Sequence, residues 1–267
     1  MSQRILMVLA DKGFPPDIRV EKEALVLSHY HKVYILTQRR FKEPEEEKIN
    51  GFIILRRLLL HKYMPKPVSY LHMTFQLMYQ LIQICIKENI DIIHVHDLPC
   101  AGPVILISKI LGKPTIIDMH EHFIEMTRPS LGRSIKSRLF LYCLCLLETI
   151  SCRYSKRIIV VVEENAKRII QRGVSPNKVI VVSNTPIIND LKKISETFKK
   201  NEKIKDHCII SYIGGFSKHR GLDTLIRALP LVIQKSQKIH VLLVGDGELK
   251  AILEQMVDEF RLRDYVT

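Results

Sequence analysis

The chain has 267 residues, which is long enough for one large domain or for two small ones. Hydrophobic residues make up 46% of the sequence and charged residues 26%, a composition that argues against a disordered chain or a coiled coil. The formal net charge of +13 favours a phosphate-bearing partner over an acidic protein, but charge alone does not choose among nucleic acid, anionic lipid and phosphorylated small molecules.

The cysteines and the apolar runs bear on the cellular compartment. The sequence has six cysteines, at positions 85, 100, 143, 145, 152 and 208. None forms a C-x-x-C pair, so we expect buried thiols in a reducing compartment. Residues Met1–Ala10 enter a strand pattern directly, which predicts no secretory signal. The longest apolar stretch, Leu139–Leu147, is too short for a bilayer, which needs about 20 residues. We expect a cytoplasmic protein, soluble or at the inner face of the membrane.

Short apolar runs rich in β-branched residues alternate with longer amphipathic segments through residues 1–187. The predicted strands are residues 4–10, 32–37, 52–56, 91–96, 115–118, 157–162 and 178–182. The predicted helices are residues 17–29, 68–87, 101–111, 134–154 and 165–172. Polar residues 38–50 predict an exposed loop. This alternation predicts an α/β, Rossmann-like domain with a parallel sheet between helices, whose ligands bind beyond the carboxyl ends of the strands.

A second unit follows residues 188–206, whose polar composition predicts a linker. Residues 207–267 predict strands at 208–213 and 239–244 and helices at 221–233 and 249–260, and Val266 and Thr267 predict the start of a third strand. Two strands with two helices leave sheet edges uncovered, and a unit this small is marginal. We therefore expect the sequence to stop inside an incomplete second Rossmann-like domain.

The segment that follows the first predicted strand contains three candidate site residues, Gly13, Asp17 and Arg19. Gly13 allows close approach of the backbone to a ligand, and Asp17 can cap the following helix. No G-x-G-x-x-G motif is present, so a dinucleotide site is not predicted. Asp17 equally fits a simple turn and cap, and Arg19 fits a solvent-exposed helix face.

Two predicted strands end in histidines and carboxylates, within residues 94–97 and 118–122. Alternation along a strand places His94 and His96 on the same face. Histidine and carboxylate are ligands of catalytic metals, so a metal-dependent hydrolase that uses His94, His96 and His120 is one hypothesis. His94 also fits a packed core residue, whereas His120, at the mouth of the crevice, has the stronger claim to chemistry.

Two glycine-containing loops follow the strands of the second unit. Residues 214–221 run from a strand into a helix, and the helix amides with Lys218 and Arg220 form a candidate phosphate site. Gly245-Asp246-Gly247 follows the next strand and fits either a plain turn or a nucleotide-contacting loop. A solvated basic loop is the alternative for Lys218 and Arg220.

Taken together, these segments resemble the family-4 retaining glycosyltransferases of the GT-B fold. The segments that carry the resemblance, in the family's order, are Pro16–Ala24, Asp91–Pro99, Asp118–Glu121, Val179–Pro186, Tyr212–Asp223 and His240–Glu248. They span nearly the whole chain.

The resemblance implies an N-terminal acceptor domain, a C-terminal donor-binding domain and a reaction in the cleft between them. A sugar would pass from a nucleoside-diphosphate-sugar to a glycan or a lipid-linked acceptor with retention. No metal or other cofactor is expected, because side chains and helix dipoles would stabilise the departing diphosphate.

The resemblance also implies roles for individual residues. His120 matches the histidine near the transferred sugar and is the expected catalytic residue. The expected donor-binding residues are Gly13, Gly214, Gly215, Lys218, Arg220 and Gly245. The expected acceptor-binding residues are Asp17, Arg19, Asp97 and Glu121.

Two departures from the family pattern matter. The family commonly has Arg directly after the first glycine of the phosphate loop and Lys before the last, where this chain has Gly215 and Arg220. The family's acidic motif, two glutamates separated by seven residues, normally lies beyond Thr267. We therefore expect the chain to be truncated in its C-terminal domain and inactive by itself.

One segment suggests contact with a membrane. Arg133, Lys136 and Arg138 precede the apolar face of Leu139–Leu147, and a basic amphipathic segment can dock on anionic lipid. The alternative is a core-facing helix with a solvated basic start. No nucleic-acid partner is expected, because aromatic and basic residues do not interleave and no known module is present.

Overall fold

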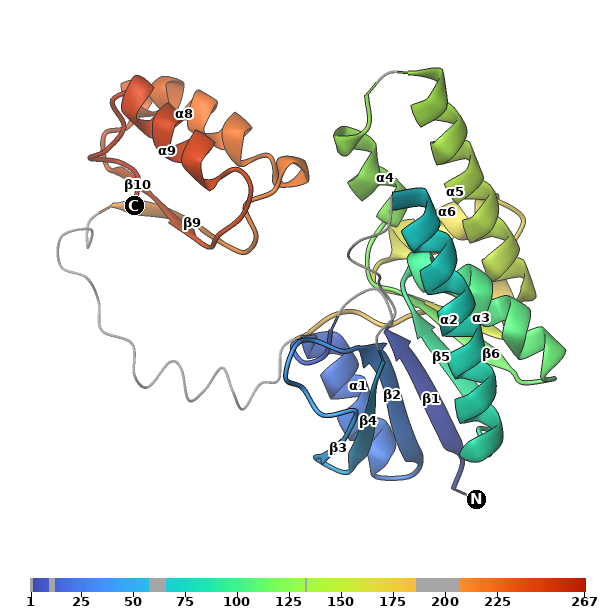
Figure 1. Cartoon of the computed structure of the whole chain (residues 1–267). Helices are drawn as coiled ribbons and strands as arrows, with labels where there is room; N and C mark the ends of the chain where they lie inside the picture. The colour runs from blue at the N-terminus through green and yellow to red at the C-terminus, as the bar shows by residue number, and fades with distance from the viewer. Residues whose placement is uncertain (1, 10–12, 58–65, 133, 186–206) are drawn as a thin grey trace. The chain divides into compact units, whose positions relative to one another are not determined.

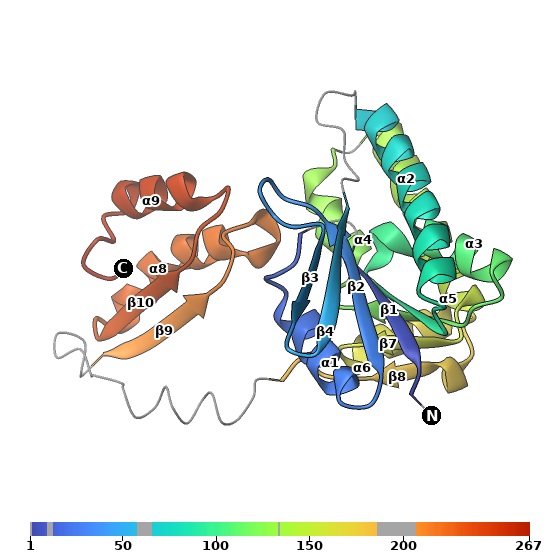
Figure 2. The ribbon, with the colours of Figure 1, turned by 60° about the horizontal axis from the view of Figure 1, so that its bottom comes forward.

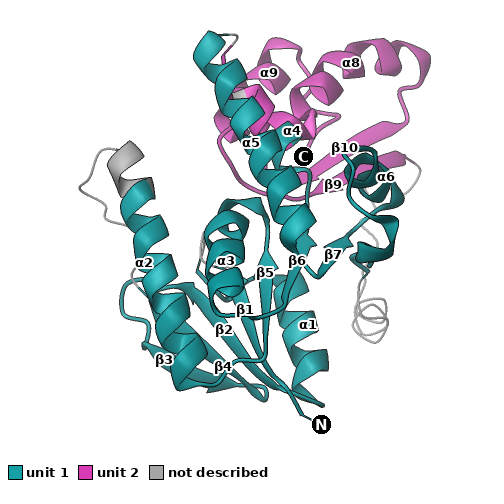
Figure 3. Ribbon diagram, turned by 90° about the vertical axis from the view of Figure 1, so that its right-hand side faces the viewer, with its two compact units in different colours: residues 1–125, 133–185 teal, residues 126–132, 186–267 magenta. Residues whose placement is uncertain are grey.

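The computed structural model describes residues 2–9, 13–57, 66–132, 134–185 and 207–267, and for residues 66–70 and 130 it describes only the backbone (Figure 1). The chain divides into two compact units. Unit 1 comprises residues 1–125 and 133–185, and unit 2 comprises residues 126–132 and 186–267 (Figure 3). The expected linker, residues 188–206, lies outside the described residues.

Unit 1 is built on an eight-stranded sheet (Figure 2). The strand order is β3-β4-β2-β1-β5-β6-β7-β8, and every neighbouring pair is parallel except β3 and β4. The strands are β1 (Arg4–Leu9), β2 (Lys32–Gln38), β3 (Glu46–Ile49), β4 (Phe52–Arg57), β5 (Ile92–His96), β6 (Thr115–Met119), β7 (Arg157–Val160) and β8 (Val179–Val181). The predicted α/β class and parallel sheet are confirmed.

Helices pack on both faces of this sheet and create two cores. Helix α1 (Ile18–Ser28) packs on β1, β2 and β4. The opposite face carries a larger core. Its helices are α2 (Lys66–Lys87), α3 (Leu98–Ile110), α5 (Ile135–Tyr154) and α6 (Glu163–Gln171). Apolar side chains on both faces explain why strands such as β1 and β2 are buried almost throughout. No helix in the described part of the chain is long and apolar enough to cross a membrane.

The structure differs from the sequence-based expectations in three places. The segment 38–50 is not wholly a loop, because Glu46–Ile49 forms β3 and pairs antiparallel with β4. Its charged residues hid the strand, which lies at the sheet edge. Helix α3 begins at Leu98, three residues before the expected start, and accommodates Pro103 in its interior. A short helix, α4 (Phe123–Thr127), follows β6 and was not expected.

The expectation of buried thiols is correct for only part of the set. Cys85, Cys100 and Cys152 are buried, whereas Cys145 is half-buried and Cys143 and Cys208 are exposed. All six are free. Cys143 is exposed because α5 carries apolar side chains on its outer as well as its inner face, so an apolar neighbourhood in sequence did not mean burial.

Unit 2 repeats the strand–helix alternation on a smaller scale. It contains β9 (Cys208–Ile213), α8 (Leu222–Lys235), β10 (Ile239–Val244) and α9 (Lys250–Glu259). The two strands are parallel, and their helices enclose a separate core around Ile226, Leu229 and Val241. Val266 pairs with Val241 as a parallel bridge, which confirms the expected start of a further strand.

Candidate functional site

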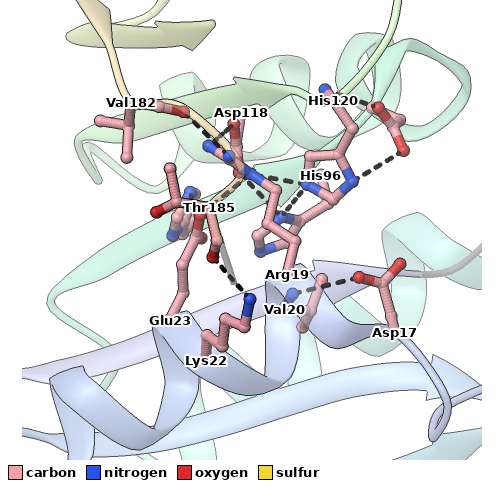
Figure 4. Close-up of polar contacts among 12 residues, drawn as sticks. Asp17, Arg19, Val20, Lys22, Glu23, His96, Asp118, His120, Val182 and Thr185 are labelled. Atoms are coloured by element: carbon pink, nitrogen blue, oxygen red, sulfur yellow. Dashed lines mark hydrogen bonds and ion pairs between the residues drawn. The ribbon is translucent and has the colours of Figure 1, made fainter. Parts of the chain in front are cut away.

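The site lies at one edge of the unit 1 sheet, where the connections change direction. Strand β1 lies between β2 and β5, so the chain leaves it on one side and returns on the other. In parallel sheets this arrangement opens a crevice beyond the carboxyl ends of the strands. The first turn of α1 and the ends of β5 and β6 bring their polar side chains together there (Figure 4).

Asp17 is the N-cap of α1. Its carboxylate accepts a hydrogen bond from the backbone amide of Val20 at 3.1 Å, so the expected capping role is confirmed. The cap fixes the first turn of α1, from which Arg19 reaches the sheet edge. The acceptor-binding role of Asp17 stays a prediction.

Arg19 and Asp118 form a buried ion pair at the centre of the site (Figure 4). The Arg19 guanidinium donates to both carboxylate oxygens, through Nε at 2.8 Å and Nη2 at 2.9 Å. Its Nη1 donates to the carbonyl of Val182 at 3.0 Å. The Arg19 side chain is only 6% exposed and that of Asp118 is fully buried, so the alternative of a solvent-exposed helix face is wrong for Arg19. Its acceptor-binding role stays a prediction.

His94 and His96 lie side by side on one face of β5, as strand alternation predicts, with ring centroids 4.4 Å apart. Both side chains are buried. Burial lowers the pKa of His94 well below its usual value, and it lowers that of His96 although Asp118 acts in the opposite direction. Both rings are therefore neutral near pH 7, and His94 combines the expected packed position with a place at the site.

His120 is held by contacts on both sides of its ring (Figure 4). Its Nε2 lies 3.1 Å from Asp118 Oδ2 and 3.1 Å from His96 Nδ1. On the other side, its Nδ1 lies 3.5 Å from Asp97 Oδ2, and its backbone amide donates to Asp97 Oδ1 at 3.1 Å. Burial opposes the charged form, but the hydrogen bond to Asp118 and the charges of Asp97 and Asp118 outweigh it and raise the pKa of His120.

Asp97, which contacts both the backbone amide and the ring of His120, has an unusual backbone conformation. Its φ of 62° lies in the left-handed region, which non-glycine residues seldom adopt. The side chain nevertheless reaches both the amide and the ring of His120. Asp97 thus connects the end of β5 to the end of β6, and the predicted site residues Asp97 and His120 do come together.

Glu23 is a site residue that the sequence interpretation missed as such. It lies one helical turn beyond Arg19, and its Oε1 is 3.1 Å from Arg19 Nε. Burial, together with the Asp118 carboxylate, raises the pKa of Glu23 to about 8. The signal was available in the sequence, since positions i and i+4 share one face of a helix.

A cavity of about 430 Å³ opens beside Glu23 and His94. It lies between α1 and strands β1, β5, β6 and β7, and most of its lining is apolar. Lys22 Nζ crosses to the carbonyl of Thr185 at 2.8 Å, so the segment that follows β8 is tied to α1 (Figure 4). Neither Lys22 nor Thr185 was a candidate from sequence.

The metal-site hypothesis can be tested on the same geometry. Ligand atoms of Glu23, His94, His96 and Asp118 lie within 4.8 Å of one another, a group that does not include His120. The guanidinium of Arg19, however, binds both oxygens of Asp118. A divalent ion would have to displace that cation or share its position, so the arrangement favours an ion-paired network over a metal site.

Gly13 and Glu121 lie at the margin of the site. The carbonyl of Gly13 accepts a hydrogen bond from Arg40 Nη2 at 2.9 Å, and a Cβ at Gly13 would collide with the same side chain. The close approach expected at Gly13 is therefore made by Arg40. Glu121 follows His120 and is exposed. The donor role of Gly13 and the acceptor role of Glu121 stay predictions.

The expected phosphate loop of unit 2 connects β9 to α8. Lys218 and Arg220 lie in a single 3-10 turn, η4 (Lys218–Arg220), and both are exposed. Gly221 follows with φ of 70°, a left-handed conformation that favours glycine, and no side chain caps α8. The loop thus places two cations next to an uncapped helix N-terminus.

The loop after β10 supports the loop after β9. The Phe216 amide donates to the Asp246 carbonyl at 2.8 Å, and the Leu249 amide donates to the Phe216 carbonyl at 3.0 Å. A Cβ at Gly245 would collide with the backbone carbonyl of Gly214. Glycine at 245 is thus required for loop packing, and its contact with a donor stays a prediction, as does that of Gly214 and Gly215.

Comparisons with known proteins agree with this arrangement. Residues 25–185 match Glycosyltransferase Family 4, and residues 193–267 match Glycosyl transferases group 1. An uncharacterised glycosyltransferase of Methanocaldococcus jannaschii is 28% identical over 90% of this chain and 60% of its own length. The gpi3 subunit of phosphatidylinositol N-acetylglucosaminyltransferase from Schizosaccharomyces pombe is 23% identical over 97% of this chain and 55% of its own. The chain thus spans little more than half of these relatives.

Solved structures give the same fold. Sucrose-phosphate synthase from Thermosynechococcus elongatus superimposes with a TM-score of 0.71 and 15% identity, over 99% of this chain and 69% of that one. Anabaena HepE in complex with UDP-glucose gives a TM-score of 0.63 and 15% identity, over 99% and 68%. These likenesses confirm the GT-B type of fold and give the hydrolase hypothesis no support. With 161 of its residues matched, the chain belongs to glycosyltransferase family 4.

Proposed function

We propose that this chain provides the acceptor-binding domain and the first phosphate loop of a retaining glycosyltransferase. The enzyme would move a sugar from a nucleoside-diphosphate-sugar to a glycan or a lipid-linked acceptor. Family membership supports glycosyl transfer. The UDP-glucose complex of HepE supports a nucleotide-sugar donor, and the phosphatidylinositol-directed relative supports a lipid-linked acceptor.

The observation that carries the proposal is the environment of His120. Its imidazole lies between the carboxylates of Asp97 and Asp118, which favour the protonated ring. A positioned imidazolium can stabilise negative charge that develops as the sugar leaves its diphosphate. Because its side chain is still 13% exposed, His120 can meet a substrate, whereas His96 cannot.

The donor diphosphate would be held by the loop of residues 214–221. Exposed cations and free helix amides are the groups that bind phosphate in proteins. In this proposal Lys218 and Arg220 supply the charge that a divalent metal supplies in other transferases, so the reaction needs no added metal. Gly215 leaves room for the diphosphate to approach, since a Cβ there would meet no atom within 4 Å.

Nucleotide binding tests the donor loop. We expect UDP to bind the 267-residue chain, and Arg220→Ala to weaken binding roughly tenfold because one charge-assisted contact is lost. Titration calorimetry without added metal and with a chelator present measures the affinity of the wild type and of Arg220→Ala for UDP. Lys235→Ala, which removes an exposed cation at the far end of α8, is the matched control. UDP binding that is equal in wild type and Arg220→Ala would contradict the assignment. A product of inverted anomeric configuration, formed by protein expressed from the whole reading frame, would overturn retention.

A further inference from the structure

Helices α2, α3 and α5 form one layer over a single face of the unit 1 sheet (Figure 3). Helix α3 packs against both α2 and α5, and the inner sides of all three join the larger core. The outer side of the layer therefore points away from the sheet. Amphipathic surface helices usually carry polar residues there.

The outer side of this layer is instead strongly apolar. On α5, Leu139, Tyr142 and Leu146 recur at intervals of three and four residues and are 61%, 66% and 49% exposed. They form one stripe, since such positions lie above one another on a helix. On α2, Leu71, Phe75 and Tyr79 recur every fourth residue and are about equally exposed. We call these six residues the outer apolar face.

The exposed charges on the described parts of α2, α3 and α5 are all basic, although Lys87 at the end of α2 pairs with Glu88, which follows the helix, at 3.8 Å. The described exposed charged residues of the three helices are Lys87, Lys109, Lys136, Arg138 and Arg153. Glu148 is the single acidic residue in the sequence of these helices, and it is buried against Arg168 and Arg172. A surface selected only for solubility mixes both signs of charge.

The combination of exposed apolar stripes with exposed basic residues indicates which kind of partner the outer apolar face binds. A second copy of the chain, packed on the same face, would bring the basic residues of α3 and α5 of both copies together, and the described parts of these helices expose no acidic residue to pair with them. An acidic protein would form ion pairs with the lysines and arginines but would leave most of the apolar stripes exposed to water. An anionic lipid surface satisfies both, because aliphatic and tyrosine side chains enter the headgroup boundary while basic side chains meet the phosphates.

We propose that the outer apolar face docks peripherally on an anionic lipid surface. The helices that follow parallel strands begin at the carboxyl edge of the sheet, so the starts of α2 and α5 lie at the same edge as His120. Docking would hold that edge close to the membrane. The surface does not depend on the proposed transferase activity, and it can be tested without a sugar donor. Arg133, which the sequence interpretation included, lies outside the described residues.

Co-sedimentation with vesicles tests the proposal on the 267-residue chain. We expect binding to phosphatidylcholine vesicles that contain phosphatidylglycerol, and much weaker binding to phosphatidylcholine alone. The variant K136Q/R138Q should lower the affinity tenfold or more, at about 1 kcal/mol per basic residue near the surface. The variant L139S/Y142S/L146S should abolish binding at physiological salt, because its apolar insertion is lost.

Matched controls distinguish docking through the outer apolar face from nonspecific effects of positive charge or of exposed apolar side chains. K235Q/K238Q removes two exposed cations of unit 2, and Y30S/F41S/L231S removes three exposed apolar side chains elsewhere. Both should bind as the wild type does. Unchanged secondary structure and melting temperature in all four variants would show that they fold. Failure of the wild type to bind anionic vesicles, or equal losses in the controls, would overturn the proposal. The proposal would also be overturned if the wild type were a dimer and only the variant L139S/Y142S/L146S were a monomer.

Discussion

Asp118 is fully buried and contacts Arg19, His96 and His120 at once. Burial opposes its ionisation, but hydrogen bonds from the two histidines and Arg19 outweigh that effect and hold the pKa of Asp118 far below its usual range. The ionised Asp118 pairs with Arg19 and accepts the hydrogen bond of His120, and together with Asp97 it favours the protonated His120 ring. In this network the neutral members are His94, His96 and, below about pH 8, Glu23.

Asp118→Asn should disturb both the charge and the stability of the site. Without the carboxylate, the pKa of His120 should fall, because the burial that opposes its charge would remain. The buried guanidinium of Arg19 would lose its partner, at about 3 kcal/mol of unfolding free energy. An NMR titration of the His120 ring and denaturant unfolding measure the two effects. Asp91→Asn, at the opposite end of β5, should change neither; an unchanged His120 titration in Asp118→Asn would refute the network.

Glu23→Gln should change how stability depends on pH. The pKa of Glu23 is about 8 in the folded state against 4.5 in its ordinary environment, so the folded state binds the extra proton between these values. The stability this contributes is complete below about pH 4.5 and is lost as the pH rises toward 8. From pH 5 to pH 8 the wild type should lose roughly 2–4 kcal/mol more unfolding free energy than Glu23→Gln.

The raised pKa of His120 acts in the same direction, since its contribution is present below its unfolded pKa and is lost as the pH rises through the folded one. Both proteins retain that contribution, so the difference between their unfolding curves isolates Glu23. Parallel curves from pH 5 to pH 8 would show that Glu23 ionises normally.

At the scale of elements, one buried carboxylate connects two helices of unit 1. Glu148 of α5 binds Arg168 of α6 through two hydrogen bonds, at 2.6 and 3.0 Å, and also contacts Arg172. Its side chain is 3% exposed. The pairing explains how an acidic residue is accommodated on the inner side of an otherwise apolar helix.

Glu148→Ala should therefore loosen α6 from α5. Two arginines would lose their partner in a partly buried position, and the unfolding free energy should fall by about 3 kcal/mol. Amide hydrogen exchange should rise first in α6. As a control, Asp258→Ala in α9 removes an exposed ion pair with Arg263 and should have no measurable effect on stability. Equal effects of the two substitutions would contradict the structural role of Glu148.

The order of strands and helices was predictable from the periodicity of apolar residues. An edge strand and the burial of several charged side chains were not. The alternation of apolar runs located every long strand and helix because burial of both sheet faces imposes it. Strand β3 escaped notice because an edge strand buries little. Arg19 looked like a solvated residue because its partner, Asp118, is 99 positions away in the sequence. Lys22 escaped notice for the same reason, because its partner Thr185 is 163 positions away. Glu23 was missed although its spacing from Arg19 on the same helix is local.

At the scale of the whole molecule, the two units have separate cores and separate candidate sites. Unit 1 holds the His120 network and unit 2 holds the basic loop of residues 214–221. Both sites follow strands at their carboxyl ends, as ligand sites in parallel sheets do. The family itself is shown by the match over residues 25–185. The chain spans 60% and 55% of the two curated relatives, so the activity of the whole protein stays a proposal.

Release of nucleoside diphosphate from nucleotide-sugars tests the central claim, that His120 acts at the transferred sugar. With a panel of UDP-, GDP- and ADP-sugars and a chelator present, wild-type protein expressed from the whole reading frame should turn over at least one donor. His120→Ala and His120→Gln should lower the rate about a hundredfold or more, with an unchanged melting temperature. His29→Ala, an exposed histidine of unit 1, should turn over as the wild type does. Wild-type rates in folded His120 variants would contradict the account.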